Sequence, residues 1–155
     1  MEMLELLTVQ PLTPADKEEF LTLSRAFYQS DAVLHEIDES CHQNAFEEMM
    51  RSDVYLLGYL LKCDGKTAGY AVLNKMFMRE VGGHVVWIEE LYVIPEFQGK
   101  GLGRAFFAWL EEHIPAVRYR LEAEPDNRRA MALYQRLGYE VLPYVQMIKD
   151  VDKQL

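Results

Sequence analysis

The chain has 155 residues, half of them hydrophobic, which suffices for one domain with an ordinary core and is too short for two. We therefore expect residues 1–155 to form a single domain. The 16 basic and 25 acidic side chains give a formal charge of −9, which argues against nucleic acid as a partner because there is no basic excess to neutralise phosphates. Acidity of this size suits a cationic substrate, although it more often serves solubility.

The sequence shows no sign of secretion or of a membrane span. Met1–Gln10 carries Glu2 and Glu5 and lacks a basic start followed by an apolar core. No apolar run approaches the ~20 residues that cross a bilayer. Cys41 and Cys63 form no C-x-x-C pair, which is typical of thiols in a reducing compartment. We expect a cytoplasmic protein with no membrane partner.

The first half of the chain combines strand-like and helical patterns. Leu4–Leu12 predicts a strand, and Thr13-Pro14-Ala15-Asp16 then predicts a helix start with proline near the first helical position. A second helix is expected through Phe46, Met49 and Met50. A hairpin joined at Asp64-Gly65-Lys66 and a third, strongly apolar strand follow, over the ranges Val54–Cys63, Thr67–Phe77 and His84–Ile94. Gly69 within the hairpin indicates a bulge or a close approach.

The second half alternates helices and strands. The first helix carries apolar residues from Leu102 to His113, and the next begins near Pro125 and ends at a Gly138 cap. Val117–Ala123 predicts a short strand between them, and Tyr139–Ile148 has strand composition. Antiparallel hairpins followed by strand-helix-strand crossovers predict an α/β fold with a mixed, mostly antiparallel sheet of six to seven strands and helices on both faces.

A glycine-rich loop separates the third apolar strand from the helix that follows it. Its sequence is Gln98-Gly99-Lys100-Gly101-Leu102-Gly103-Arg104. Glycines this close mark a place where backbone approaches a ligand, and a helix start offers unpaired amides to an anion. Lys100 and Arg104 add positive charge, so we expect a phosphate. A Walker loop is absent, and a dinucleotide fingerprint would need glycine where Arg104 stands.

Two motifs together resemble the GNAT superfamily of N-acetyltransferases. The first is Gln98-x-x-Gly101-x-Gly103 after Leu91-Tyr92-Val93, and the second is Asn127-x-x-Ala130-x-x-Leu133-Tyr134 followed by Gly138-Tyr139. The resemblance covers about residues 84–139. It implies the GNAT fold, in which two central parallel strands splay apart to admit the pantetheine arm, and acetyl-CoA as the co-substrate.

The resemblance also implies how the cofactor is held. Leu91, Tyr92 and Val93 would supply backbone groups to the pantetheine and the thioester, and Asn127 would touch the pantetheine. The pyrophosphate would lie on the loop, whose residues are Gln98, Gly99, Lys100, Gly101, Leu102, Gly103 and Arg104.

Acetyl transfer to an amine requires a base, because an alkyl amine with a pKa near ~10.4 is protonated at neutral pH. Glu89 and Glu90 precede the cofactor segment and would face opposite sides of a regular strand. Paired acids here resemble the polyamine acetyltransferase branch, where they serve the amine. The sequence does not decide which of the two is the base, and Glu89 is our first choice. Glu122, on the neighbouring strand, is the alternative, because the branch that acetylates protein N-termini has its base there.

Asn127 and Tyr134 lie seven positions apart and so share one helix face, about ~10.5 Å apart along the axis. That spacing suits an extended ligand. In the family, the tyrosine hydroxyl stands near the sulfur and protonates the departing thiolate. We expect Tyr134 to be the general acid.

The acceptor amine is the part of the predicted reaction that the sequence determines least. The element order of the family places an acceptor site after the first helix, near Tyr28, Asp31, His35 and Glu36. A small cationic amine is expected, while a protein N-terminus, a lysine, or a non-catalytic acyl-CoA-binding module are open alternatives. The histidine spacing predicts no metal site. A homodimer formed through the last strand is also open.

Overall fold

The computed structural model describes residues 7–151. The first three residues of the predicted strand Leu4–Leu12 and the last four residues of the chain lie outside this range. In the described part, no helix has the length and the apolar character needed to cross a membrane.

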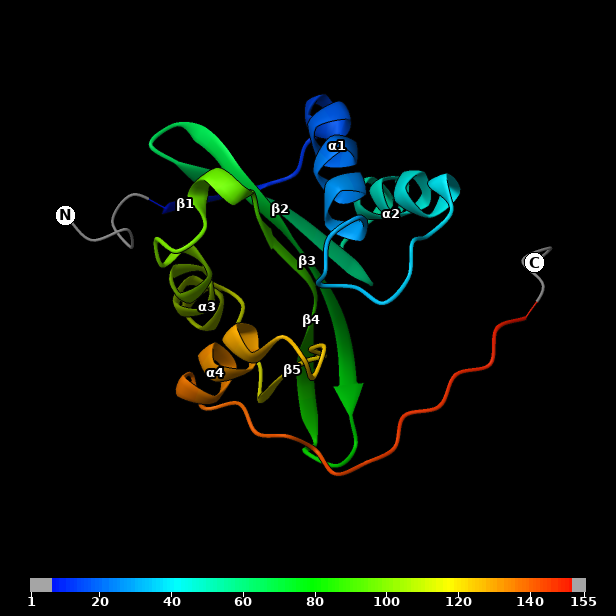
Figure 1. The fold of residues 1–155 in the computed structure, drawn as a ribbon. Coiled ribbons are helices and arrows are strands. Elements are labelled where there is room, and N and C mark those ends of the chain that lie inside the picture. The colour runs from blue at the N-terminus through cyan, green and yellow to red at the C-terminus, as the bar shows by residue number, and fades with distance from the viewer. Residues whose placement is uncertain (1–6, 152–155) are drawn as a thin grey trace.

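A five-stranded sheet forms the centre of the molecule, and its strand order follows the sequence, β1-β2-β3-β4-β5 (Figure 1). The first three neighbouring pairs are antiparallel, and β4 and β5 are parallel. The strands are β1 (Leu7–Pro11), β2 (Leu56–Cys63), β3 (Lys66–Met78), β4 (Gly83–Val93) and β5 (Arg118–Leu121). The predicted mixed, mostly antiparallel sheet is confirmed.

The β2–β3 hairpin forms where the sequence predicts it. Asp64 and Gly65 have φ values of 52° and 76°, and two consecutive positive values are the requirement of a tight hairpin turn. At Gly69 the backbone of β4 approaches so closely that an added Cβ would collide with the Tyr92 carbonyl. Gly69 therefore marks a close approach, which was one of its two expected roles.

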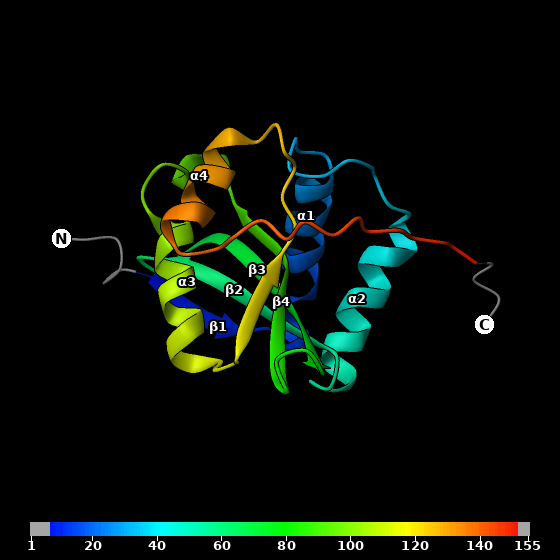
Figure 2. The ribbon, with the colours of Figure 1, turned by 90° about the horizontal axis from the view of Figure 1, so that it is seen from below.

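Helices cover both faces of the sheet, as predicted, and the described part of the chain has four of them (Figure 2). On one face lie α1 and α2, and on the other lie α3 and α4. Their bounds are α1 (Lys17–Tyr28), α2 (Glu39–Arg51), α3 (Leu102–His113) and α4 (Arg128–Arg136), and short 3-10 turns cover Pro14–Asp16 and Pro95–Phe97.

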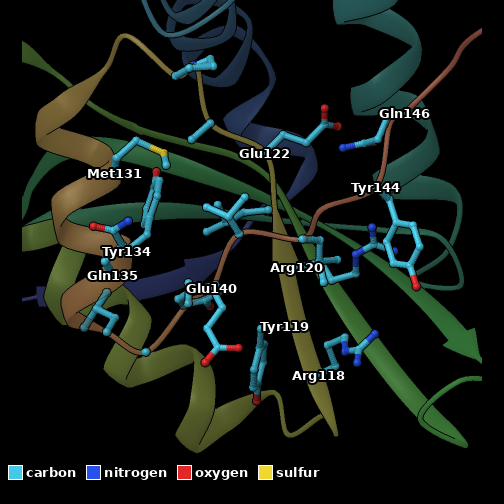
Figure 3. A pocket seen from close by; sticks show the side chains of 18 of the residues that line it. Arg118, Tyr119, Arg120, Glu122, Met131, Tyr134, Gln135, Glu140, Tyr144 and Gln146 are labelled. Carbon is cyan, nitrogen blue, oxygen red and sulfur yellow. The ribbon is translucent and has the colours of Figure 1, made fainter.

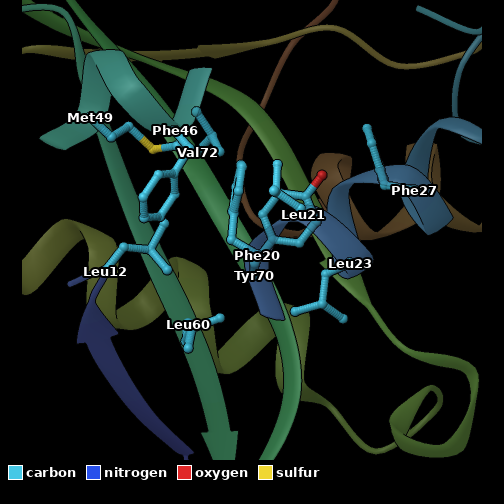
Figure 4. Packing of buried hydrophobic residues seen from close by; sticks show 10 residues of the cluster. All are labelled: Leu12, Phe20, Leu21, Leu23, Phe27, Phe46, Met49, Leu60, Tyr70 and Val72. Atoms are coloured by element: carbon cyan, nitrogen blue, oxygen red, sulfur yellow. The ribbon is translucent and has the colours of Figure 1, made fainter. Parts of the chain in front are cut away.

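Each face has its own apolar core. Buried residues of α1 and α2, among them Phe20 and Phe46, pack against Tyr70 and Val72 of β3 (Figure 4). On the opposite face Phe106 of α3 packs with alternate sheet residues such as Ala71, Leu73 and Ile88. Side chains of neighbouring strand residues point to opposite faces, which separates the two cores.

The predicted sixth strand, Tyr139–Ile148, is wrong. These residues belong to no strand, and most of their apolar side chains are exposed, including Val145 and Ile148 at 89% each. A strand needs a neighbouring edge, and β5 offers only four residues; Pro143 also removes one donor from the segment. Within residues 7–151, the sheet therefore has five strands instead of six or seven.

The expected parallel pair is present, but it lies at the edge of the sheet and not at its centre. Pairing of β4 with β5 runs from Val85–Arg118 to Ile88–Leu121, and β4 then continues to Val93 beyond the end of β5. The second half of β4 is thus paired with β3 alone among the described strands.

Candidate active site

The glycine-rich loop leads from β4 into α3 with two residues in left-handed conformation. Gly99 and Gly101 have φ values of 76° and 82°, which glycine adopts without a steric cost. The first helical hydrogen bond runs from the Ala105 amide to the Gly101 carbonyl at 3.0 Å. The amides of residues 102–104 precede that bond, so they are available to an anion at the helix start.

Three cationic side chains surround this loop, one more than the sequence indicated. Lys100 lies over the Phe97 ring at 5.4 Å, and Arg104 is exposed on the first turn of α3. Arg129, from the first turn of α4, places Nη2 3.4 Å from the position of a Cβ added at Gly99. In the sequence, Arg129 is marked only by its place two residues after Asn127.

Gln98 has a structural role that the motif did not indicate. Its side-chain amide donates to the Val93 carbonyl at 2.9 Å, which ties the loop to the end of β4. The helix start is thereby held against the strand that carries Leu91, Tyr92 and Val93. These three residues are half-buried and pair with Ala71, Tyr70 and Gly69 of β3.

A β-bulge brings both glutamates to the same face of the sheet. Val72 pairs with Glu90 and Leu73 pairs with Ile88, so Glu89 is the extra residue. Glu89 accepts from the Asn74 side chain at 2.6 Å. Asn74 and Val72 are two positions apart and share the face of α1 and α2. A regular strand would place the two carboxylates on opposite faces, as expected from alternation, but the bulge makes this strand irregular.

Glu90 is half-buried and accepts two tyrosine hydroxyls. Tyr70 donates to one carboxylate oxygen at 2.5 Å, and Tyr28 donates to the other at 3.3 Å. The pKa of the Glu90 carboxyl is raised overall. Burial is the largest cause of the rise, the hydrogen bond from Tyr70 opposes it, and the negative charge of Glu89 adds to it. Burial likewise raises the pKa of Tyr28, and the Glu90 charge adds to that rise.

The Glu89 side chain is more exposed than that of Glu90, and it interacts electrostatically with a third carboxylate. Desolvation by the surrounding protein raises its pKa, the bond from Asn74 lowers it, and the charge of Glu122 raises it. Glu122 is exposed just after β5. The three carboxylates that the sequence singled out therefore gather where β4 continues beyond β5.

Tyr134 lies on α4 with its ring against those of Phe107 and Tyr139, at 5.7 and 6.2 Å between centroids. Burial raises the pKa of its hydroxyl, which keeps the phenol protonated at neutral pH. Asn127 caps the same helix, and its side chain accepts from the Ala130 amide at 3.2 Å. Contact with a ligand would have to use the remaining hydrogen-bonding capacity of this amide.

A pocket of about 800 Å³ lies beside β5, between α4 and the segment after residue 139 (Figure 3). Tyr134 and Glu122 both line it, together with Met131, Tyr144 and other residues. The glycine-rich loop does not contribute to the lining. The pocket lies next to the outer edge of β5, where the predicted sixth strand would have paired.

Of the four expected acceptor residues, only Tyr28 is brought to the glutamates. Asp31, His35 and Glu36 are exposed in the connection between α1 and α2. Within residues 7–151, no hydrogen bond or ion pair joins these three to Glu89 or Glu90. Tyr70 and Asn74, which do bind the glutamates, were missed because strand positions of β3 carry no motif.

The sequence and the fold of this chain match known proteins over most of its length. The Acetyltransferase (GNAT) family matches residues 18–139. A curated relative, an uncharacterized N-acetyltransferase of Methanocaldococcus jannaschii, is 24% identical over 152 residues, which cover 93% of this chain and 67% of the relative.

Solved structures share the fold at low sequence identity. An aminoglycoside N-acetyltransferase in complex with CoA has a TM-score of 0.73 at 18% identity, over 93% of this chain and 94% of that one. A ribosomal-protein-alanine N-acetyltransferase from Brucella melitensis biovar Abortus 2308 has a TM-score of 0.72 at 18% identity, over 93% of this chain and 99% of that one.

The family match spans most of the chain and includes the glycine-rich loop, the end of β4 and α4. The α/β architecture, with helices on both faces of a mixed sheet, is the fold of the solved relatives. The chain therefore belongs to the acetyltransferase (GNAT) family and is an N-acetyltransferase that uses acetyl-CoA as its co-substrate.

Proposed function

We propose that the protein moves an acetyl group from acetyl-CoA to a primary amine of a small cationic molecule, by direct attack of the amine in a ternary complex. The observation that carries this proposal is the pair of carboxylates on one face of the sheet, Glu89 and Glu90, beside the segment Leu91–Val93. Paired negative charges next to the thioester favour an acceptor that arrives as an ammonium ion.

The cofactor would extend from the glycine-rich loop to Tyr134. Its pyrophosphate would be held by the amides of residues 102–104 and by the charges of Lys100, Arg104 and Arg129. The pantetheine would run along Leu91–Val93, where β4 lacks β5 as a neighbour, with Asn127 at its side.

The two glutamates would divide the work on the amine. Glu89, exposed and with a raised pKa, would take the proton from the ammonium nitrogen. Glu90, held by two tyrosines, would balance the positive charge of the acceptor. The free amine would then attack the thioester carbonyl and form the C–N bond. The C–S bond would break as Tyr134 gives its proton to the departing thiolate. The nitrogen would lose its second proton to solvent, which leaves the neutral amide, and solvent would return a proton to Tyr134.

A second class of acceptor has its own support. The charge of Glu122 raises the pKa of the Glu89 carboxyl, so a base directly after the end of β5 would act at the same place as Glu89. One solved relative acts on an aminoglycoside and another on the alanine of a ribosomal protein, so both acceptor classes occur on this fold. A protein N-terminus or a lysine is therefore the alternative acceptor.

The test is a panel of acceptors assayed for release of the CoA thiol from acetyl-CoA. The panel contains polyamines, amino-sugars, and peptides with free N-termini or lysines. The proposal predicts turnover with small cationic amines. It also predicts that Glu90→Gln lowers kcat/KM at least tenfold and that Glu122→Gln lowers kcat/KM much less. Activity confined to peptides and abolished by Glu122→Gln would contradict it.

A further inference from the structure

The chain after α4 carries a run of large apolar side chains that are exposed. It leaves α4, passes the sheet and continues apart from the other elements (Figure 1). Five of its apolar side chains are between 65% and 89% exposed, namely Tyr144, Val145, Met147, Ile148 and Val151. Monomeric proteins rarely leave so large a contiguous apolar surface in water, so this run indicates a contact with another molecule.

The backbone of this segment and the outer edge of β5 both lack partners. Tyr139 donates the last main-chain hydrogen bond, to the Tyr134 carbonyl at 3.0 Å. Within residues 7–151, no main-chain hydrogen bond involves residues 140–151. Among the described strands, β5 pairs with β4 alone. An edge with unpaired amides and carbonyls is a template on which another chain can pair.

A hollow lies along this free edge. The pocket of about 800 Å³ is lined by β5 and by residues that follow α4, among them Tyr139 and Leu142 (Figure 3). Tyr134 and Glu122 line it as well. A volume of this size accommodates several side chains, so it can receive an extended segment beside β5.

The sequence disfavours a return of residues 144–151 into the hollow of their own copy. Such a return needs a tight turn after Leu142, and tight hairpin turns depend on Gly, Asn or Asp at positive φ. None of these residue types occurs between Tyr139 and Lys149, and no residue from 139 to 151 has a positive φ. The chain continues past Pro143 without a turn. A second copy can supply the same segment without any turn.

We propose that residues 144–151 of one copy lie along the outer edge of β5 in a second copy, between β5 and residues 139–142, and that the exchange is reciprocal. A two-fold arrangement satisfies both free edges at once and closes the assembly at a dimer. The inserted segment then has backbone neighbours on both sides. In a single chain, the four-residue edge of β5 is its only neighbouring strand. The proposal does not depend on the identity of the acceptor amine.

The composition of the segment fits this position. In an extended chain Val145, Met147 and Val151 lie on one face, and Tyr144 and Ile148 lie on the other. Apolar residues on both faces are typical of a strand that is covered on both faces. Two such segments, with the surfaces that receive them, would remove on the order of 1,600 Å² from water, which is the size of a standard stable interface.

The first experiment measures the oligomeric state by sedimentation. The proposal predicts a dimer of the parent at micromolar concentration. Val145→Glu and Met147→Glu should each weaken dimerisation about tenfold or more, because each places a charge in the buried interface. Leu34→Glu is the matched control, since Leu34 is also an exposed apolar residue, at 75%, but lies between α1 and α2, and it should leave the dimer unchanged. Circular dichroism confirms that each variant is folded.

The second experiment tests where the segment binds. A chain that ends at Pro143 is mixed with a synthetic peptide of residues 144–151. The proposal predicts that the shortened chain is monomeric, binds the peptide and melts at a higher temperature in its presence. A peptide that carries both Val145→Glu and Met147→Glu should neither bind nor stabilise the shortened chain.

Three results would overturn the proposal. A parent that stays monomeric up to ~100 µM would do so, whether hydrogen exchange finds residues 144–151 protected within their own copy or open to a different partner. A dimer that persists in both glutamate variants would show that the copies meet through another surface. A shortened chain that fails to bind the parent peptide would show that the segment does not lie on β5.

Discussion

At the residue scale, the site depends on one extra residue in a strand. The sequence predicted Glu89, Glu90, Glu122 and Tyr134 as the polar groups of the site, and the structure gathers the three carboxylates at the end of the β4–β5 pairing. Strict alternation predicts that Glu89 and Glu90 diverge. The bulge places both toward α1 and α2, and no residue type in β4 signals a bulge there.

Glu89→Gln should abolish the low-pH limb of kcat. A base accepts a proton only when it is ionised, so kcat of the parent rises with pH through the pKa of Glu89, which is raised above its usual value. The variant should lose about 10²- to 10⁴-fold in kcat, and its remaining activity should be flat across that limb. Steady-state rates from pH 5 to 9 measure this. Glu90→Gln is the matched control and should keep the limb; a limb that persists in Glu89→Gln and disappears in Glu90→Gln would exchange the two roles.

Tyr134→Phe should lower kcat by about 10²-fold and leave the affinity for CoA unchanged. The substitution removes only the hydroxyl that would protonate the thiolate, and the ring keeps its contacts with Phe107 and Tyr139. Calorimetry with CoA and steady-state rates check the two parts. Tyr139→Phe, in the same aromatic cluster, is the control. Unchanged turnover in Tyr134→Phe would show that the proton comes from elsewhere.

At the element scale, the sequence predicts where α3 begins, but it does not predict the side chains that surround this helix start. Three glycines and two cations predicted an anion site at a helix start, and the structure places the start of α3 at Leu102, after two glycines in left-handed conformation. Arg129 reaches the same loop from α4, and Gln98 fastens it to β4. Both contacts join segments that are distant in sequence or have no periodic pattern, so only tertiary packing reveals them.

Substitutions at two of the three glycines of this loop, Gly101 and Gly103, should have separable effects. An added Cβ at Gly103 would meet only Leu133 Cδ2 at 3.7 Å, an ordinary contact, so Gly103→Ala should fold normally. It should weaken CoA binding about tenfold if the pyrophosphate lies on these amides, because a side chain in place of glycine limits how closely a phosphate approaches the backbone. At Gly101, φ of 82° makes alanine cost about 1 kcal/mol of stability. Calorimetry and thermal unfolding measure both variants. Normal CoA affinity in Gly103→Ala would contradict the placement of the pyrophosphate.

At the scale of the whole molecule, the order of elements predicted the fold class and both helical layers. Hairpin turns and buried apolar periods are local signals, and they placed β2, β3, β4 and α3 near their observed positions. The segment after residue 139 was misjudged because composition alone does not make a strand. The strand with which it would have paired, β5, presents an edge of only four residues, and the apolar side chains of the segment are exposed.

A crystal structure of the protein with CoA tests the central claim most directly, because it locates the cofactor relative to every residue named above. The account predicts the pyrophosphate on the amides of residues 102–104, with Arg129 beside it. It also predicts the sulfur within hydrogen-bonding reach of the Tyr134 hydroxyl, with Glu89 and Glu90 facing the thiol end. CoA bound in the pocket beside β5, with its phosphates away from Gly99–Arg104, would contradict the account.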